Sequence, residues 1–172
     1  MDVVVRAADQ PGDLGWMVWQ HGEVYAATLD WDTTFEALVA RIVADYAAAP
    51  PSPRRAGWIA ELDGARVGCV LCVPDPSDDS VAVLRILLVT PGARGRGVGA
   101  ALVDACVTHA RAAGCTAVTL WTNDVLASAR RIYEAAGFDL MDQESHQSFG
   151  QDLVGQHWRL ELAARPAGAQ TR

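Results

Sequence analysis

The chain has 172 residues, a length that favours one domain with a full hydrophobic core. Hydrophobic residues make up 51% of it and charged residues 20%, which excludes an intrinsically disordered chain, and no apolar run reaches the ~18 residues of a membrane span. The net charge is −7, and the excess of acidic residues lies before Arg54, where eight acids accompany two arginines, so we expect no nucleic-acid partner.

The N-terminal part predicts one strand and two helices. Val3-Val4-Val5 indicates a short first strand, and Asp13 to Tyr25 indicates a helix with an inward apolar face. The side chains expected on that face are Trp16, Met17 and Trp19. Thr33-Thr34-Phe35-Glu36 has the spacing of a capping box, so a second helix is predicted to begin there and to end before Pro50.

The middle of the chain predicts a hairpin and buried thiols. Trp58 to Leu62 and Arg66 to Val73 are apolar runs joined by Asp63-Gly64, a dipeptide typical of a two-residue turn. Cys69 and Cys72 lie in the second run, where residues three apart point to opposite faces, which suits neither a zinc site nor a redox turn. Together with Cys106 and Cys115 they are expected to be buried free thiols in a reducing, cytoplasmic compartment.

The C-terminal half alternates strands and helices. Val81 to Val89 is almost continuously apolar and predicts a central strand covered on both faces. The later elements are expected as a helix at 97–113, a strand at 116–122, a helix at 126–136, and closing strands at 138–141 and 156–162. This order predicts an α/β fold of the mixed α+β kind. We expect a single domain over 1–165 and a frayed tail at 166–172.

A glycine-rich turn after the central strand is the segment most informative about function. It reads Val89-Thr90-Pro91-Gly92-Ala93-Arg94-Gly95-Arg96-Gly97-Val98-Gly99. Glycines let the backbone approach a ligand closely, and the first amides of a helix have no partner within the helix. Together with the helix dipole these amides form an anion site, usually for a phosphate or pyrophosphate, and Arg94 and Arg96 add positive charge.

Two common phosphate loops do not fit this turn. A P-loop ends in Gly-Lys-Ser/Thr, and the chain contains no lysine. A Rossmann turn needs G-x-G-x-x-G, whereas Gly95, Gly97 and Gly99 are spaced by two, and it needs an acid at the end of the next strand, which 116–121 lacks. The pattern that remains is R-x-x-G-x-G, formed by Arg94, Gly97 and Gly99.

This pattern resembles the acetyl-CoA pyrophosphate loop of the GCN5-related N-acetyltransferase (GNAT) family. Ala129 to Phe138 is similar to that family's second signature, A-x-x-x-Y-x-x-x-G-F, and follows the first after one helix and one strand. The resemblance is clearest from Leu84 to Phe138 and extends from Val3 to Leu162. The closing stretches at 121–124 and 148–156 are similar to acetyltransferase domains fused to MarR-type regulators.

The resemblance implies a GNAT fold, a central mixed sheet of about seven strands flanked by about four helices. It implies that the main chain of Leu87 to Val89 runs beside the pantetheine arm, where parallel strands splay apart, and that amides from Gly95 to Ala100 hold the pyrophosphate. The implied acetyl-CoA-binding residues are Leu87, Leu88, Val89, Arg94, Gly95, Arg96, Gly97, Val98, Gly99, Ala100, Asn123 and Arg130.

The resemblance also implies direct attack of an amine on the thioester, with Tyr133 as the catalytic proton donor to the departing thiolate. An alkylammonium has a pKa near ~10.4 and must first lose a proton, while a thiolate of pKa near ~8.5 leaves better once protonated. The other interpretation is that Tyr133 only packs its helix on the sheet. No cysteine lies in a strand-to-helix elbow, so a covalent acyl-enzyme has no support.

Two positions depart from the family pattern. Leu126 stands where members often place an asparagine, so Asn123 either takes that role through a longer loop or caps the helix. The family's general base is commonly a glutamate near the start of the central strand, but Val81 to Leu84 contains no carboxylate, so water or another element must supply the base. Arg85 on this strand needs a partner, either a structural ion pair or a carboxylate of the acceptor.

Aromatic and histidine residues near the expected acceptor cleft are the other candidates. In the family's fold the N-terminal helices and the last strands border this cleft. A histidine has an unperturbed pKa near ~6.5, which suits a base, although a lone histidine such as His146 is more often structural. The predicted acceptor-side residues are Tyr25, Trp31, Arg85, Trp121 and His146, with His21 and Glu23 as further candidates.

We therefore predict an N-acetyltransferase that uses acetyl-CoA and a primary amine, either a small molecule or a peptide, without a metal. The acidic N-terminal third favours a cationic amine or basic peptide, whereas Arg85, if it binds substrate, favours an amino acid. The alternative is a non-catalytic acyl-CoA-binding sensor or regulatory module. We expect no membrane partner, no secretory signal, and a monomer or homodimer in the cytoplasm.

Overall fold

A computed structural model describes residues 2–162, which form one seven-stranded sheet in the order β1-β2-β3-β4-β5-β7-β6. Within it β4 and β5 pair in parallel and all other neighbours are antiparallel, so the predicted mixed sheet is confirmed. The strands are β1 (Val4–Ala7), β2 (Ala56–Leu62), β3 (Ala65–Pro74), β4 (Val81–Val89), β5 (Ala117–Asn123), β6 (Asp139–Ser148) and β7 (Gln151–Glu161). The tail expected at 166–172 lies outside the described residues.

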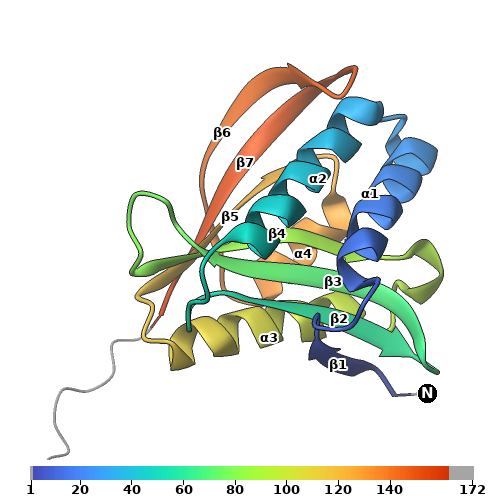
Figure 1. Cartoon of the computed structure of the whole chain (residues 1–172). Helices are drawn as coiled ribbons and strands as arrows, with labels where there is room; N and C mark the ends of the chain where they lie inside the picture. Colours follow the sequence, from blue (N-terminus) through green and yellow to red (C-terminus); the bar gives the residue numbers. More distant parts are fainter. Residues whose placement is uncertain (1, 163–172) are drawn as a thin grey trace, which may run out of the picture.

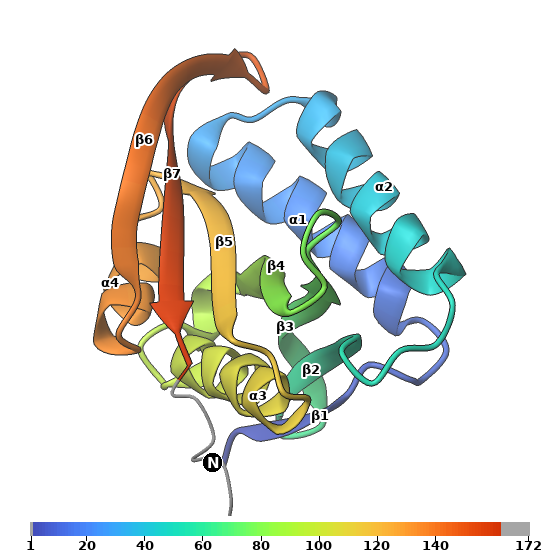
Figure 2. The ribbon, with the colours of Figure 1, turned by 90° about the vertical axis from the view of Figure 1, so that its left-hand side faces the viewer.

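Helices cover both faces of the sheet (Figures 1 and 2). They are α1 (Asp13–Leu29), α2 (Thr33–Ala48), α3 (Val98–Ala112) and α4 (Ala127–Ala135), with a single 3-10 turn, η1 (Pro91–Ala93), before α3. One hydrophobic cluster, which includes Met17 and Leu71, lies beneath α1 and α2, and a second, which includes Leu102 and Tyr133, lies beneath α3 and α4. No helix within residues 2–162 combines the length and the apolar character needed to cross a bilayer.

The cysteines are structural, as predicted. Cys69 packs in the cluster beneath α1 and α2, whereas Cys72, three residues later, packs in the cluster beneath α3 and α4. All four cysteines are buried and free. Burial raises the pKa of the Cys69 thiol well above its ordinary value, so this thiol stays protonated and is a poor nucleophile.

Two local predictions are confirmed in detail. Asp63 and Gly64 have positive φ angles of 51° and 77°, the conformation that an Asp-Gly turn adopts between two antiparallel strands. The central strand β4 has the predicted bounds, and helices or strands occupy each of the other predicted segments. The turn and strand signals therefore predicted where the site's main elements lie.

Two predictions about the N-terminal helices were wrong. Trp19 is 56% exposed, because the inward face of α1 is formed by residues spaced by three or four, among them Asp13, Met17 and His21. The N-cap of α2 is Asp32, not Thr33, since the Asp32 carboxylate accepts a hydrogen bond from the amide of Thr34. Both errors leave the predicted helices in place: the first changes which side chains of α1 are buried, and the second changes which residue caps α2.

The closing hairpin is longer than the two short strands expected at 138–141 and 156–162. Strand β6 is exposed along most of its length, so its sequence has no alternation of apolar and polar residues to reveal it. The hairpin bends toward the connection between α1 and α2 (Figure 2). There the Asp32 amide donates to the Phe149 carbonyl at 3.1 Å, and the rings of Trp31 and Phe149 lie 4.9 Å apart.

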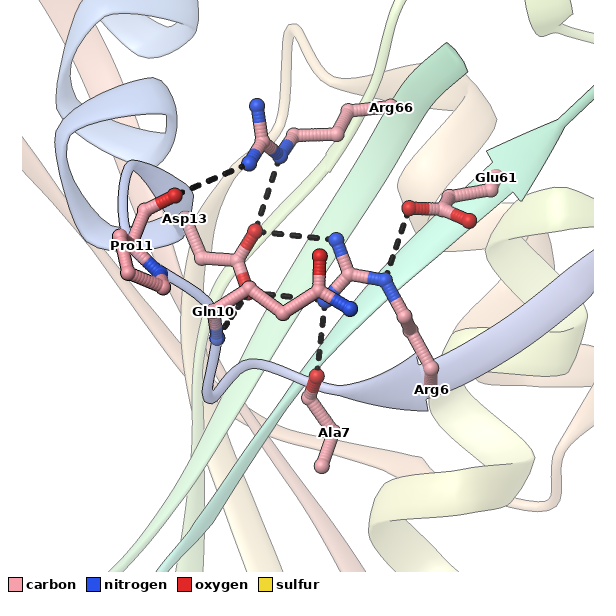
Figure 3. A network of polar contacts seen from close by, with 7 residues as sticks. All are labelled: Arg6, Ala7, Gln10, Pro11, Asp13, Glu61 and Arg66. Atoms are coloured by element: carbon pink, nitrogen blue, oxygen red, sulfur yellow. Dashed lines mark hydrogen bonds and ion pairs between the residues drawn. The ribbon is translucent and has the colours of Figure 1, made fainter. Parts of the chain in front are cut away.

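A buried carboxylate ties the start of α1 to the first three strands (Figure 3). Asp13 is fully buried and accepts from Arg6 Nη1 and from Arg66 Nε, each at 2.8 Å, and from the amide of Gln10 at 2.9 Å. The Arg6 Nε also donates to Glu61 at 2.7 Å. The hydrogen bond from Arg6 is the main cause that lowers the pKa of Asp13 to about 2. This network holds α1 at a fixed position over the sheet.

Candidate functional site

The two parallel strands separate after a short pairing. β4 pairs with β5 from Val81 to Val83, but the two strands continue to Val89 and Asn123. Their opposed main-chain groups beyond that point have no strand partner, because the ladder has ended. The predicted splay of the parallel strands is therefore present.

A bulge in β4 lies at this split. The register with β3 shifts between Leu88, which faces Cys69, and Arg85, which faces Leu71. Within the shift, Ile86 has a φ of +49°, a left-handed conformation that a β-branched residue rarely adopts and that costs free energy. Such a backbone persists where the surrounding structure imposes it, and here it turns the last residues of β4 toward the opening.

A cavity of about 560 Å³ begins at the split. Its walls come from α1, the end of β4, the glycine-rich turn, the first turn of α3, and α4. All the predicted acetyl-CoA-binding residues line it except Arg96, Asn123 and Arg130. Thr28 on α1 also lines the cavity and was not predicted, and on α4 Arg131 lines it in place of Arg130.

The glycine turn presents free amides to this cavity. Gly97 is the N-cap of α3 with a φ of +78°, and no side chain caps the helix. The first backbone bond across this end runs from the amide of Ala101 to the carbonyl of Gly97 at 3.0 Å, so the three amides before it have no carbonyl within the helix. A Cβ added at Gly95 or Gly97 would meet no atom within 4 Å, which shows that both face open space. This geometry suits an anion.

Gly99 has a different role from its neighbours. A Cβ at this position would lie 2.5 Å from the Ile132 Cδ1, so the glycine permits a close approach of α3 and α4. Because α4 also contributes Arg131 and Ile132 to the wall, this contact sets the width of the cavity. The second glycine of the R-x-x-G-x-G pattern thus shapes the pocket by packing.

Tyr133 is buried beneath the cavity wall. It is 4% exposed, and its ring lies 5.8 Å from Phe138 and 6.4 Å from Trp158. Burial raises the pKa of its phenol well above the ordinary value, and the nearby Tyr25 acts in the same direction. The hydroxyl therefore keeps its proton at neutral pH, as a proton donor must, while the ring packs in the cluster beneath α3 and α4.

Asn123 and Arg130 make contacts outside the cavity. The Asn123 Oδ1 lies 2.8 Å from the Nε2 of His146, and the residue at the N-cap of α4 is Leu126, so the Asn123 side chain is not the helix cap. Arg130 donates from Nη1 to the carbonyl of Asp124 at 3.4 Å. Neither residue lines the cavity.

The predicted acceptor-side aromatics divide into two groups. Tyr25 lines the cavity, and burial raises the pKa of its phenol to about 12, whereas Trp31 is 4% exposed and packs against Tyr25 and Phe35. Trp121 is 41% exposed and lies directly on Gly155, where a Cβ would be 1.9 Å from its ring. Trp31 is thus part of the core, whereas Trp121 is exposed and does not line the cavity.

The histidine candidates have their nitrogens engaged or buried. His146 Nε2 faces the Asn123 carbonyl oxygen, which can only accept, so this nitrogen carries a proton, and Nδ1 lies 2.9 Å from the hydroxyl of Ser148. In the neutral ring both nitrogens are therefore used. His21 is 2% exposed, and burial lowers its pKa to about 4. Glu23 is exposed on α1 and does not line the cavity. This arrangement does not favour any of the three as a base.

One of the two roles predicted for Arg85 was a structural ion pair, and residues 2–162 contain no such pair. It is half-buried, and within residues 2–162 it makes no hydrogen bond or ion pair. It faces Leu71 across the β3–β4 ladder, on the face of the sheet beneath α1 and α2.

Within residues 2–162, no group of three or more His, Cys, Asp or Glu residues is arranged to hold a metal ion.

Comparison with known proteins identifies the family. Over 77 residues the chain is 42% identical to the mycothiol acetyltransferase of Beutenbergia cavernae, a match that covers 44% of this chain and 25% of that protein. It is 35% identical over 89 residues to human N-acetylaspartate synthetase, covering 52% of this chain and 29% of that protein. The chain thus spans about a quarter to a third of the length of these curated relatives.

A solved structure shows the same fold. The phosphinothricin acetyltransferase of Sinorhizobium meliloti in complex with acetyl-CoA superimposes with a TM-score of 0.75 at 20% sequence identity, covering 100% of this chain and 93% of that one. Residues 14–138, which include the split strands, the glycine turn and α4, match the family described as Acetyltransferase (GNAT) family. The chain therefore belongs to the GNAT family of acetyltransferases.

Proposed function

We propose that the chain is an N-acetyltransferase that transfers the acetyl group of acetyl-CoA directly to a primary amine. The observation that carries the proposal is the junction of the split strands with the glycine turn. There the main chain at the end of β4 and the three amides that open α3 line one cavity. Membership of the GNAT family supports the same reaction.

The cavity fits the chemistry of a CoA thioester. The amides of Val98, Gly99 and Ala100 would hold the pyrophosphate, with Arg94 at the rim adding positive charge. The main chain of Leu87 to Val89, free on its β5 side, would bond the amides of the pantetheine arm as a strand would. The acetyl end would then lie at the split, close to the bulge at Ile86.

The reaction needs two proton movements. The neutral amine attacks the thioester carbonyl carbon, the new C–N bond forms, the C–S bond breaks, and the thiolate receives a proton. Tyr133 is the group we assign to that last step, because its buried phenol stays protonated near the cavity. We propose that the proton of the attacking nitrogen leaves through water, because the cavity lining includes no Asp, Glu or His side chain.

The kind of acceptor, the cellular compartment and the oligomeric state are further parts of the proposal. The acceptor is a small molecule or a peptide, and the names of the two relatives differ in the compound they mention. We propose a cytoplasmic monomer or homodimer. The likeness of the closing stretches to domains fused to MarR-type regulators remains a prediction.

Two measurements test the function. Calorimetric titration with acetyl-CoA and with desulfo-CoA reports whether the cavity binds the cofactor, and we expect micromolar dissociation constants for both. A screen of amines for acetyl-CoA-dependent release of thiol then reports transfer. Binding without thiol release for any amine would instead support the non-catalytic acyl-CoA-binding module, and the absence of binding at millimolar acetyl-CoA would contradict the assignment of the cavity.

A further inference from the structure

Arg85 occupies the point of β4 at which an acceptor would meet the thioester. It lies two residues beyond Val83, the last residue that pairs with β5, and two residues before Leu87, which lines the cavity. Two residues of strand span about 6–7 Å, a distance that an arginine side chain covers. Arg85 is therefore on the open side of the split and next to the position proposed for the acetyl group.

The register shows which other side chains share its face. Val83 pairs with Thr119, and along β5 the face of Thr119 continues to Trp121. The opposite face of β5 packs in the cluster beneath α3 and α4 through Val118 and Leu120. The exposed ring of Trp121 and the guanidinium of Arg85 thus belong to one surface, reached from the gap between the split strands.

Arg85 has no carboxylate partner within residues 2–162, whereas the other arginines on the sheet have one. Arg6 and Arg66 share the carboxylate of Asp13, and Arg159 donates to Glu161 at 2.5 Å. Arg85 is half-buried, yet no carboxylate within residues 2–162 reaches it. None of the Arg85 guanidinium nitrogens is among the buried side-chain nitrogens that lack a hydrogen bond, so they face solvent and are accessible to a ligand. The planar fork of a guanidinium matches a carboxylate with two parallel hydrogen bonds.

We propose that Arg85 binds a carboxylate of the acceptor, so that the substrate is an amine with a carboxylate a few bonds from its nitrogen, as in an amino acid. This inference rests on the proposed function and gives its acceptor a chemical class. The carboxylate would be held on the Arg85 side of the split while the amine points toward the end of β4. Arg85 is a specificity-determining residue in this arrangement, and it takes no part in the bond changes.

The test compares matched acceptors and matched variants. L-amino acids and their carboxamides are assayed for thiol release with the wild type, Arg85→Gln and Arg85→Lys, with Arg111→Gln as a control because Arg111 is exposed at the far end of α3. We expect the wild type to prefer the acid over its amide. Arg85→Gln should lower kcat/KM for the acid by about 100-fold, through KM, and leave the amide within about threefold. Arg85→Lys should recover part of the loss, and Arg111→Gln should leave kcat/KM unchanged for both the acid and the amide.

A measurement of amino-acid binding tests the carboxylate site independently of acetyl transfer. Calorimetric titration of the amino acids into the CoA-saturated protein needs no turnover. Binding that Arg85→Gln abolishes, in the absence of any thiol release, would keep the carboxylate site and overturn acetyl transfer. Equal or better turnover of the carboxamides, an equal loss of both substrates in Arg85→Gln, or no Arg85-dependent binding would overturn the carboxylate site, whatever the reaction. Unchanged acetyl-CoA affinity in Arg85→Gln excludes misfolding as the cause of a loss.

Discussion

Arginines lie on the sheet both near the start of α1 and at the split between β4 and β5, but only those near α1 have a carboxylate partner. At the start of α1, Arg6 and Arg66 converge on the buried carboxylate of Asp13 (Figure 3). At the split, Arg85 has no such partner among the described residues, and the backbone of β4 is bulged against β3 and unpaired with β5. The first region has its polar groups satisfied internally, which fixes the fold. The second leaves the Arg85 donors without a protein partner and open to solvent, where a ligand can reach them.

This comparison predicts that changes in the two regions have separable effects. Changes at the split should alter binding and turnover with a small effect on the free energy of unfolding. Changes at the Asp13 network should alter the free energy of unfolding with a small effect on kinetics, because none of its members lines the cavity. Each variant below is to be measured for both properties.

Gly97→Glu should have the largest effect. The side chain would place a carboxylate among the amides that open α3, and we expect acetyl-CoA to bind on the order of 1000-fold more weakly. The positive φ of 78° should cost the fold about 1–2 kcal/mol. Gly92→Glu is the matched control, because Gly92 lies in the same turn outside the cavity lining and has open space around it. Equal affinities for the two variants, by calorimetry, would contradict the anion site.

Asp13→Asn should be the largest change in stability. It removes the charge between Arg6 and Arg66 and leaves two guanidinium groups next to a neutral amide, so we expect a loss of about 3 kcal/mol in the free energy of unfolding. Asp79→Asn is the control, since Asp79 is 90% exposed and its pair with Arg54 should contribute less than about 1 kcal/mol. Urea unfolding measures both, and kcat should stay within about twofold. A large fall in kcat for the folded Asp13→Asn protein would break the separation.

Tyr133→Phe should lower turnover and leave binding intact. The ring keeps its contacts with Phe138 and Trp158, while the proton for the thiolate is lost, so kcat should fall about 100-fold with the acetyl-CoA affinity unchanged. Tyr46→Phe removes the hydroxyl of a partly buried tyrosine on α2, outside the cavity lining, and should leave kcat unchanged. Full activity of Tyr133→Phe would leave Tyr133 with its packing role alone.

The parts of the molecule that the sequence predicted well are those with a strong local signal. The bounds of β4, the Asp63-Gly64 turn and the glycine turn all depend on residues adjacent in the chain. The long β6–β7 hairpin was missed because β6 is exposed and polar, so pairing with β7 defines it and periodicity does not. For Arg85 the sequence left two roles open, because its lack of a carboxylate partner depends on how neighbouring strands meet around it.

The site shows the same division between local and tertiary information. The motif spacing found the glycine turn, but the prediction named Arg130, which differs from Arg131 by one helical position of about 100°. Arg131 lines the cavity and Arg130 contacts Asp124 instead. Ser128 and Arg131, three residues apart on α4, both line the cavity, and this helical spacing was the available signal.

The smallest expected effect is on how the free energy of unfolding changes with pH. It tests whether the Asp13 network is electrostatic. The pKa of Asp13 is lowered from 3.8 to about 2 in the folded protein, so its contribution is complete above pH 3.8 and is lost as the pH falls from 3.8 through 2. A shift of this size corresponds to roughly 2 kcal/mol. The gap in the free energy of unfolding between wild type and Asp13→Asn should therefore narrow by about that amount between pH 6 and pH 2.

His21 does not obscure this measurement. Burial lowers its pKa from 6.5 to about 4, so both proteins lose stability as the pH falls from 6.5 to 4, and the loss cancels in the difference. Urea unfolding at a series of pH values follows the gap directly. A gap that stays constant down to pH 2 would show that the carboxylate of Asp13 is not stabilised by its arginines. The network would then hold α1 through packing and shape, and the contrast with Arg85 would lose its electrostatic basis.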